Sequence, residues 1–270
     1  MSISTRIIQY GELGIVIEAL TPTSEEVVSH LDESFQHFQL KDDYAALARV
    51  VFGLGLEQSA FFGVLNGMTD HARYVTTWVH SSVRVTSVPV ALHKLLSCVD
   101  AAAAEYYAPR GGILLHAAAA SLRHQGFLFL GKSGAGKSTT AKNTAKVGIP
   151  VLGEDRVFVL PSKNGEYVLG KAQTYPAQLI THPELIPPLR GIFLLAQDTN
   201  DHLERMTQTQ TAKMMFQAFQ EHPAGSALPP KLLRSIFQTA CQIARQVPGY
   251  ILHLRNAPDF WNLIDAEFPN

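Results

Sequence analysis

Residues 127–147 read FLFLGKSGAGKSTTAKNTAKV, and this stretch is the most informative part of the sequence about the fold. It begins with the apolar run Phe127–Leu130, continues with the glycine-rich loop Gly131–Ser138, and ends in a segment, Thr139–Val147, that is expected to form a helix stopped by Gly148. The loop matches the pattern G-x-x-x-x-G-K-[ST], which lies between a strand and a helix and cradles phosphates. This context predicts a nucleotide-phosphate site.

Each position of the loop has a physical reason. Glycines let successive backbone N–H groups point at one anion, and the following helix directs its positive end to the same place. Lys137 is a point charge for the terminal phosphates, and the hydroxyl of Ser138 can complete a magnesium shell. The candidate nucleotide-binding residues are Gly131, Ser133, Gly134, Ala135, Gly136, Lys137, Ser138 and Thr139.

We expect a β-hairpin directly before the loop. Its strands cover Ile113–Leu122 and Phe127–Leu130, and a turn at Arg123–Gly126 joins them. Further expected strands and helices alternate on both sides. The expected strands are 7–10, 14–19, 74–79, 82–88, 151–152, 156–160, 166–169, 191–195 and 250–254, and the expected helices are 23–37, 91–107, 211–222, 231–247 and one from Pro258. This mixture predicts an α/β or α+β fold with a central mixed sheet.

Composition excludes several classes of protein. The 270 residues are 46% hydrophobic and 17% charged with a net charge of −1, which argues against intrinsic disorder and against nucleic-acid or membrane binding. No apolar run is long enough to span a bilayer, and the N-terminus does not resemble a signal peptide. The two cysteines, Cys98 and Cys241, and the histidines show no metal-ligand spacing, so we expect a cytoplasmic protein without a structural metal.

The stretch LLHAAAASLRHQGFLFLGKSGAGKSTTAKNTAKVGIPVLGEDRVFVL, residues 114–160, resembles the catalytic core of HPr kinase/phosphorylase. It is most similar to the wider group of HPr-kinase-like proteins, some of which accompany peptide-modification gene clusters. The resemblance implies a phosphoenolpyruvate-carboxykinase-like P-loop core over residues 91–270. Residues 1–90 would then form a smaller N-terminal α+β lobe that binds the acceptor or regulates the core.

The resemblance also implies roles for residues outside the loop. His116 matches the family histidine on the strand before the loop, which would act near the γ-phosphate; a core histidine is the alternative. Glu154 and Asp155 match two adjacent acids, of which the first takes the serine proton and the second binds magnesium. The first acid is Asp in the family, so Glu154 is a departure that keeps the carboxylate and moves it by one methylene.

Arg190 matches a family arginine near the active site, with a surface arginine as the alternative. The family glutamate two positions earlier is replaced by Pro188, which weakens the expectation of the reverse, phosphorylase, reaction. The resemblance therefore assigns catalytic roles to Glu154, His116, Lys137 and Arg190, and metal binding to Ser138 and Asp155.

The leading interpretation is a kinase that uses ATP and Mg²⁺ to phosphorylate a serine of a protein or peptide. One alternative is a catalytically weak ATP-binding regulatory or scaffold protein of a peptide-modification system, and another is a small-molecule hydroxyl kinase. The expected partner is a serine-containing protein or peptide, and a homo-oligomer is left open by the multi-subunit assemblies of the family.

Overall fold

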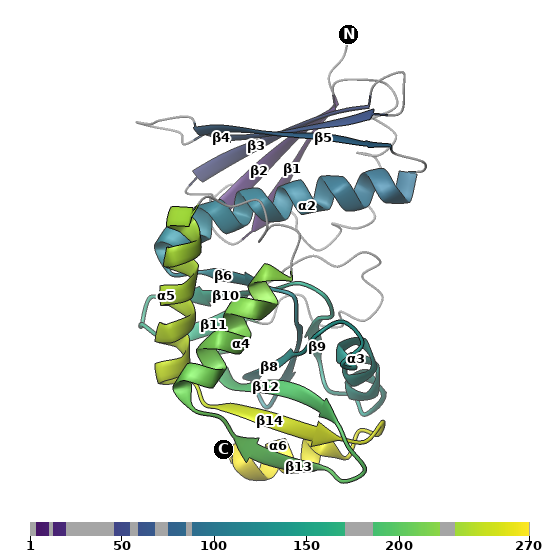
Figure 1. Ribbon diagram of the computed structural model, residues 1–270, viewed down its shortest axis with the longest axis vertical. Coiled ribbons are helices and arrows are strands. Elements are labelled where there is room, and N and C mark those ends of the chain that lie inside the picture. Colours follow the sequence, from purple (N-terminus) through teal and green to yellow (C-terminus); the bar gives the residue numbers. More distant parts are fainter. Residues whose placement is uncertain are drawn as a thin grey trace. The chain divides into compact units, whose positions relative to one another are not determined.

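The computed structural model describes residues 4–10, 13–19, 46–54, 59–67, 75–84, 88–170, 186–221 and 230–269 (Figure 1). The chain folds as two units, Met1–Tyr106 and Tyr107–Asn270. Residue 90, where the sequence pattern changes, lies inside the helix α2 (Val88–Tyr107), and nearly all of this helix belongs to the first unit. None of the described helices is both long and apolar enough to cross a membrane.

The first unit contains a five-stranded sheet in the order β1-β2-β3-β4-β5. Its strands are β1 (Ser4–Tyr10), β2 (Leu13–Ala19), β3 (Ala46–Leu54), β4 (Ser59–Gly67) and β5 (Val75–Arg84). The pairings are antiparallel except for β2 with β3, which run parallel. The predicted hairpin of β1 with β2 is confirmed. The prediction of two strands over 74–79 and 82–88 is wrong, because β5 is one strand, and the predicted helix 23–37 lies outside the described residues.

The second unit is a mixed α/β fold built on two sheets. The larger sheet has six strands in the order β13 (His202–Arg205), β14 (Gly249–Leu254), β12 (Leu189–Gln197), β8 (Gln125–Leu130), β7 (Ala118–Leu122) and β9 (Val151–Gly153). Strands β14, β12 and β8 are parallel, and the remaining pairings are antiparallel. The smaller sheet is antiparallel, with β11 (Tyr167–Gly170), β10 (Val157–Pro161) and β6 (Ile113–Leu115).

Helices cover both faces of the six-stranded sheet. Alternate strand residues point to one face, where they pack against α3 (Lys137–Lys146) and α6 (Phe260–Glu267) in a core rich in aromatic rings. Trp261 of α6 donates a hydrogen bond from Nε1 to Oγ1 of Thr144 in α3, which satisfies a buried indole N–H (3.0 Å). The other face meets α4 (Gln208–Gln220), which pairs with α5 (Pro230–Gln246).

The run Ile113–Leu122 is two strands and not the single predicted strand, because it breaks at His116 and Ala117. The first part, β6, pairs with β10 in the small sheet, and the second part, β7, pairs with β9 in the large sheet. Both members of this antiparallel ribbon therefore cross from one sheet to the other at the same point. The crossing segments touch through the N–H of Ala117, which donates to the carbonyl oxygen of Asp155 (3.2 Å).

The turn before the phosphate loop is tighter than predicted. Only Arg123 and His124 form it, both with positive φ (51° and 61°), as expected for a two-residue hairpin turn that matches the strand twist. Gly126, predicted as a turn glycine, lies within β8. A Cβ at Gly126 would lie 2.7 Å from Cδ1 of Leu169 and 3.0 Å from the carbonyl oxygen of Pro188, so close packing requires this glycine.

The end of β14 is joined to the start of β13 by a charged clamp between Arg255 and Asp201. Asp201 is nearly buried, with a side chain 9% exposed, and it accepts hydrogen bonds from the backbone N–H (2.7 Å) and from Nη2 (2.9 Å) of Arg255. Because the Arg255 guanidinium donates to it, the pKa of Asp201 lies below its ordinary value. The clamp therefore favours the folded state when Asp201 is ionised.

We expect Asp201→Asn to lower the melting temperature Tm by a few degrees at pH 7. A folded-state pKa below the unfolded value, about 3.9, gives stability that is present above that value and is lost as the pH falls through the folded-state pKa. The difference from wild type should therefore shrink below about pH 4. Thermal unfolding followed by circular dichroism at several pH values measures it.

Asp259→Asn is the matched control, because the 56% exposed Asp259 contacts the same guanidinium nitrogen at 3.2 Å. Exposed ion pairs contribute little, so Tm should stay close to wild type. Equal losses in the two variants would contradict the assignment of the clamp to Asp201.

Candidate functional site

The loop Gly131–Ser138 has the backbone shape of an anion-binding nest. It follows directly from the end of β8, and α3 begins at Lys137. Gly134 and Gly136 have positive φ (83° and 103°), a conformation that glycine adopts without strain. A Cβ at Gly131 would lie only 2.6 Å from Cβ of Ala135, so the turn closes tightly there.

Lys137 lies across the inside of the loop. Its side chain is buried, and Nζ donates to the carbonyl oxygens of Gly131 (2.6 Å) and Lys132 (3.3 Å). Burial lowers the pKa of Lys137 from its ordinary value, while the negative charges of Glu221 and Asp155 act in the opposite direction. The lysine is thus positioned as a cation inside the nest, and two carboxylates lie within electrostatic reach.

The other predicted loop residues divide by exposure. Ser138 and Thr139, in the first turn of α3, are exposed and open to a ligand, as are Ser133 and Gly134. Ala135 and Gly136 are partly exposed. Ser138 and Thr139 lie in the first turn of α3, and the N–H groups of a first helical turn have no partner within the helix and commonly bind anions.

His116 and Asp155 meet where the ribbon crosses between the sheets. Nδ1 of His116 lies 3.0 Å from Oδ1 of Asp155, and Nε of Arg156 lies 3.6 Å from Oδ2 of the same carboxylate. The backbone N–H of His116 donates to the carbonyl oxygen of Ala218 in α4 (3.1 Å), which ties the crossing to that helix. The structure therefore brings His116 to Asp155.

Glu154 precedes Asp155 in the bend that follows β9. Its side chain is partly exposed and forms no hydrogen bond or ion pair with the residues that the structure describes. Asp155, by contrast, is engaged on both of its oxygens. The two adjacent acids thus differ in environment: the carboxylate of Asp155 faces the side chains of His116 and Arg156, and the carboxylate of Glu154 forms no hydrogen bond or ion pair with the described residues.

Glu221 is a member of this group that the sequence did not reveal. It caps the C-terminus of α4, where its N–H donates to the carbonyl oxygen of Gln217 (2.9 Å). Its charge acts on Lys137. No motif marks a glutamate that lies 84 positions from the lysine in the chain, and only the packing of α4 on the sheet brings the two together.

A pocket of about 300 Å³ opens beside the loop. It lies at the carboxyl ends of the parallel strands β12 and β14, where ligands bind in open α/β sheets. Its lining combines the start of α3 with the two strand ends: Ala135, Gly136, Thr139, Thr140, Gln197, Asp198, Leu254, Arg255 and Asn256. The residues after β12 and β14 were also missed from the sequence, because they carry no motif.

Arg190 is not brought to the loop. It lies at the start of β12, where Leu189 pairs with Gly126 at the start of β8, whereas the loop follows the other end of β8. Nη1 of Arg190 pairs with Oε1 of Glu166 at 2.9 Å, and both side chains are about half-exposed. In this structure Arg190 makes a surface ion pair.

The arrangement brings together a glycine-rich loop, the ammonium of Lys137 and the carboxylates of Asp155 and Glu221, which are the kinds of groups used in phosphate and metal chemistry. A family model described as SynChlorMet cassette protein ScmC matches residues 90–268. The match covers the second unit up to residue 268, and so includes the loop, the crossing and the pocket. Among curated proteins, none matches the chain.

We expect Glu221→Gln to lower the pKa of Lys137 further, because the variant removes a charge that raises it and leaves burial unchanged. The pH titration of the lysine ¹³Cε resonance, assigned with Lys137→Arg, measures the change. Glu166→Gln is the control, since that glutamate pairs with Arg190 away from the loop. A titration of Lys137 that is the same in Glu221→Gln and wild type would show that the α4 terminus does not act on the lysine.

Proposed function

The chain belongs to the ScmC family of SynChlorMet cassette proteins, and from this premise we propose that it is an ATP-dependent kinase acting on a serine hydroxyl of a protein or peptide. One observation carries the proposal: the phosphate loop lies within electrostatic reach of the crossing that holds Asp155 and His116. A cation for phosphates and a carboxylate for metal or proton chemistry are what phosphoryl transfer requires. The strand hairpin before the loop supports a phosphoenolpyruvate-carboxykinase-like core.

Binding of ATP would rest on the loop and on the pocket beside it. The N–H groups around Gly134 and Gly136 and the ammonium of Lys137 would hold the β- and γ-phosphates. The pocket at the ends of β12 and β14 is of a size that suits part of a nucleoside. Its polar lining, which includes Gln197 and Asn256, offers hydrogen-bond partners for a base or a ribose.

The residues at the site fit a magnesium ion. Mg²⁺ prefers oxygen ligands, and it commonly takes one or two from protein and the rest from phosphates and water. The exposed hydroxyl of Ser138 and the carboxylate of Asp155 are such donors. When bound, the ion would neutralise charge on the transferring phosphate. His116 would orient the carboxylate of Asp155, which is a more specific role than the one implied by the family resemblance.

The transfer itself needs a base and an oriented acceptor. The serine oxygen forms a bond to the γ-phosphorus as the bond from that phosphorus to the oxygen of the departing ADP breaks, and the hydroxyl proton goes to the carboxylate of Glu154. Glu154 suits this role because its side chain is partly exposed and forms no hydrogen bond or ion pair with the described residues.

A second candidate function is ATP binding without transfer, in a regulatory or scaffold protein. The observation that favours it is the state of Asp155, whose two oxygens face His116 and Arg156. Side chains that already occupy the space beside both carboxylate oxygens would compete with a metal ion for them. The two candidates agree on nucleotide binding and differ only in whether the γ-phosphoryl group leaves ATP.

We expect Gly134→Ala to weaken ATP binding about tenfold, which corresponds to about 1.4 kcal/mol. Alanine is strained at positive φ, so the loop must change shape to relieve the strain. Gly165→Ala is the matched control, because Gly165 has nearly the same φ (85° against 83°) and is equally open to a Cβ, but lies in the β10–β11 turn. Calorimetric titration with ATP should show a loss in Gly134→Ala alone, and equal affinities would contradict the assigned loop.

For transfer, we expect labelled γ-phosphate to pass from Mg-ATP to members of a serine-peptide library with the wild-type protein. Glu154→Gln should reduce the rate at least about a hundredfold and keep ATP binding, because it removes the base and leaves the loop intact. Lys137→Ala should lose both binding and transfer.

Glu166→Gln controls for the loss of a glutamate elsewhere in the unit and should transfer like wild type. Tight ATP binding with no transfer to any peptide would reject the kinase and favour the second candidate. Unchanged transfer in Glu154→Gln would keep the kinase and remove Glu154 as its base.

A further inference from the structure

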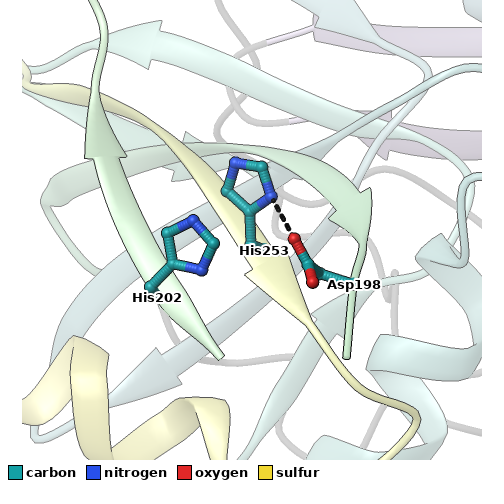
Figure 2. Close-up of side chains that lie close together, drawn as sticks. All are labelled: Asp198, His202 and His253. Carbon is teal, nitrogen blue, oxygen red and sulfur yellow. Dashed lines mark hydrogen bonds and ion pairs between the residues drawn. The ribbon is translucent and has the colours of Figure 1, made fainter. Parts of the chain in front are cut away.

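Two histidines and an aspartate gather at the edge of the six-stranded sheet (Figure 2). His202 begins β13 and His253 lies in β14, and the two residues are direct partners across these antiparallel strands. Asp198 follows the end of β12, so three neighbouring strands each contribute one side chain. Figure 2 shows the two rings side by side, with the carboxylate of Asp198 toward His253.

The side chains of this His–His–Asp cluster lie close together, and a backbone hydrogen bond orients the aspartate. The imidazole rings are stacked, with centroids 4.0 Å apart and planes within 8°. Oδ2 of Asp198 lies 3.1 Å from Nδ1 of His253, and one ligand atom from each of the three residues lies within 4.8 Å of the others. Oδ1 of Asp198 accepts a hydrogen bond from the N–H of Thr199 (2.6 Å), which orients the carboxylate.

One nitrogen of the cluster lacks a hydrogen-bond partner among the described residues. Nε2 of His253 is shielded from solvent, and its nearest ionic neighbour is Oε2 of Glu204 at 3.8 Å, beyond hydrogen-bond distance. Nδ1 of the same ring already lies 3.1 Å from the carboxylate of Asp198, so Nε2 is the ring nitrogen that is left for another ligand. A neutral imidazole is the form that binds transition metals.

We infer that Asp198, His202 and His253 form a binding site for a divalent transition-metal ion of the zinc class. Two imidazoles and one carboxylate are a donor set that suits Zn²⁺, whereas Mg²⁺ prefers oxygen alone. In a tetrahedral zinc site with bond lengths of roughly 2.0–2.2 Å, the ligand atoms lie roughly 3.3 Å or a little more from one another. The ligand atoms here lie within 4.8 Å of one another, so rotation of the side chains must shorten these distances on binding. Asp198 and His202 are exposed, which leaves them free to do so.

The site does not depend on the proposed kinase function, although the two regions adjoin. Asp198 also lines the pocket beside the loop. Arg255, which forms the clamp with Asp201, lines the same pocket. A bound metal would cross-link the ends of β12, β13 and β14, so it should stabilise this edge of the sheet. The site could not be recognised from the sequence, because its ligands have none of the spacings typical of metal motifs. The expectation of no structural metal rested on those spacings alone.

The test uses the full chain freed of metal with a chelator. Zn²⁺ is titrated in competition with a chromogenic chelator, and Co²⁺ is added in parallel, because its visible spectrum reports ligand number. We expect one tight zinc equivalent that millimolar Mg²⁺ does not displace, and a rise in Tm on binding. His202→Asn and His253→Asn should each weaken zinc binding at least tenfold.

His124→Asn is the matched control, because His124 is an exposed histidine of the β7–β8 turn with positive φ (61°), which asparagine accommodates. It should bind zinc like wild type. His202 is exposed, so His202→Asn is decisive even if the His253 variant unfolds. Wild-type affinity in His202→Asn, or no binding of wild type at micromolar zinc, would overturn the inference.

Discussion

The burial of a positive charge at Lys137 is the constraint on which the site depends. An ammonium out of water must find partners, and two carbonyl oxygens of the loop supply them at 2.6 and 3.3 Å. The same loop takes positive φ at Gly134 and Gly136, a conformation that glycine adopts without strain. The charges of Glu221 and Asp155 oppose the effect of burial, so the end of α4 and the bend after β9 must both lie near the loop.

The crossing of the β6–β7 and β9–β10 ribbon is the second determinant of the site. In a regular ladder the backbone N–H and C=O groups pair continuously and the side chains project alternately from the two faces. Where both strands leave one sheet for the other, pairing stops at His116 and Asp155, and these residues contact each other across the break. The break therefore places a polar pair, His116 and Asp155, between otherwise buried strands, and the charge of Asp155 acts on Lys137 of the loop.

Much of the second unit could be predicted from local pattern. The strand, loop and helix of residues 127–147 were recognisable because glycine, lysine and hydroxyl positions follow from backbone geometry. Helices α4, α5 and α6 and strands β12 and β14 were placed to within a few residues, since their apolar spacing matches their burial. The break at His116 was missed, because an apolar run has the same composition whether it serves one sheet or two.

Local sequence patterns were enough to predict the glycine-rich loop, the mixed α/β class and the pair of adjacent acids, because each depends on neighbours in the chain. Folding in three dimensions was needed to bring the charge of Glu221 near Lys137, to pair Arg190 with Glu166 away from the loop, and to bring His202 to His253 and Asp198. These contacts join residues on different strands and helices. Their distances depend on strand order and register, which pairing across the whole sheet sets and no local spacing encodes.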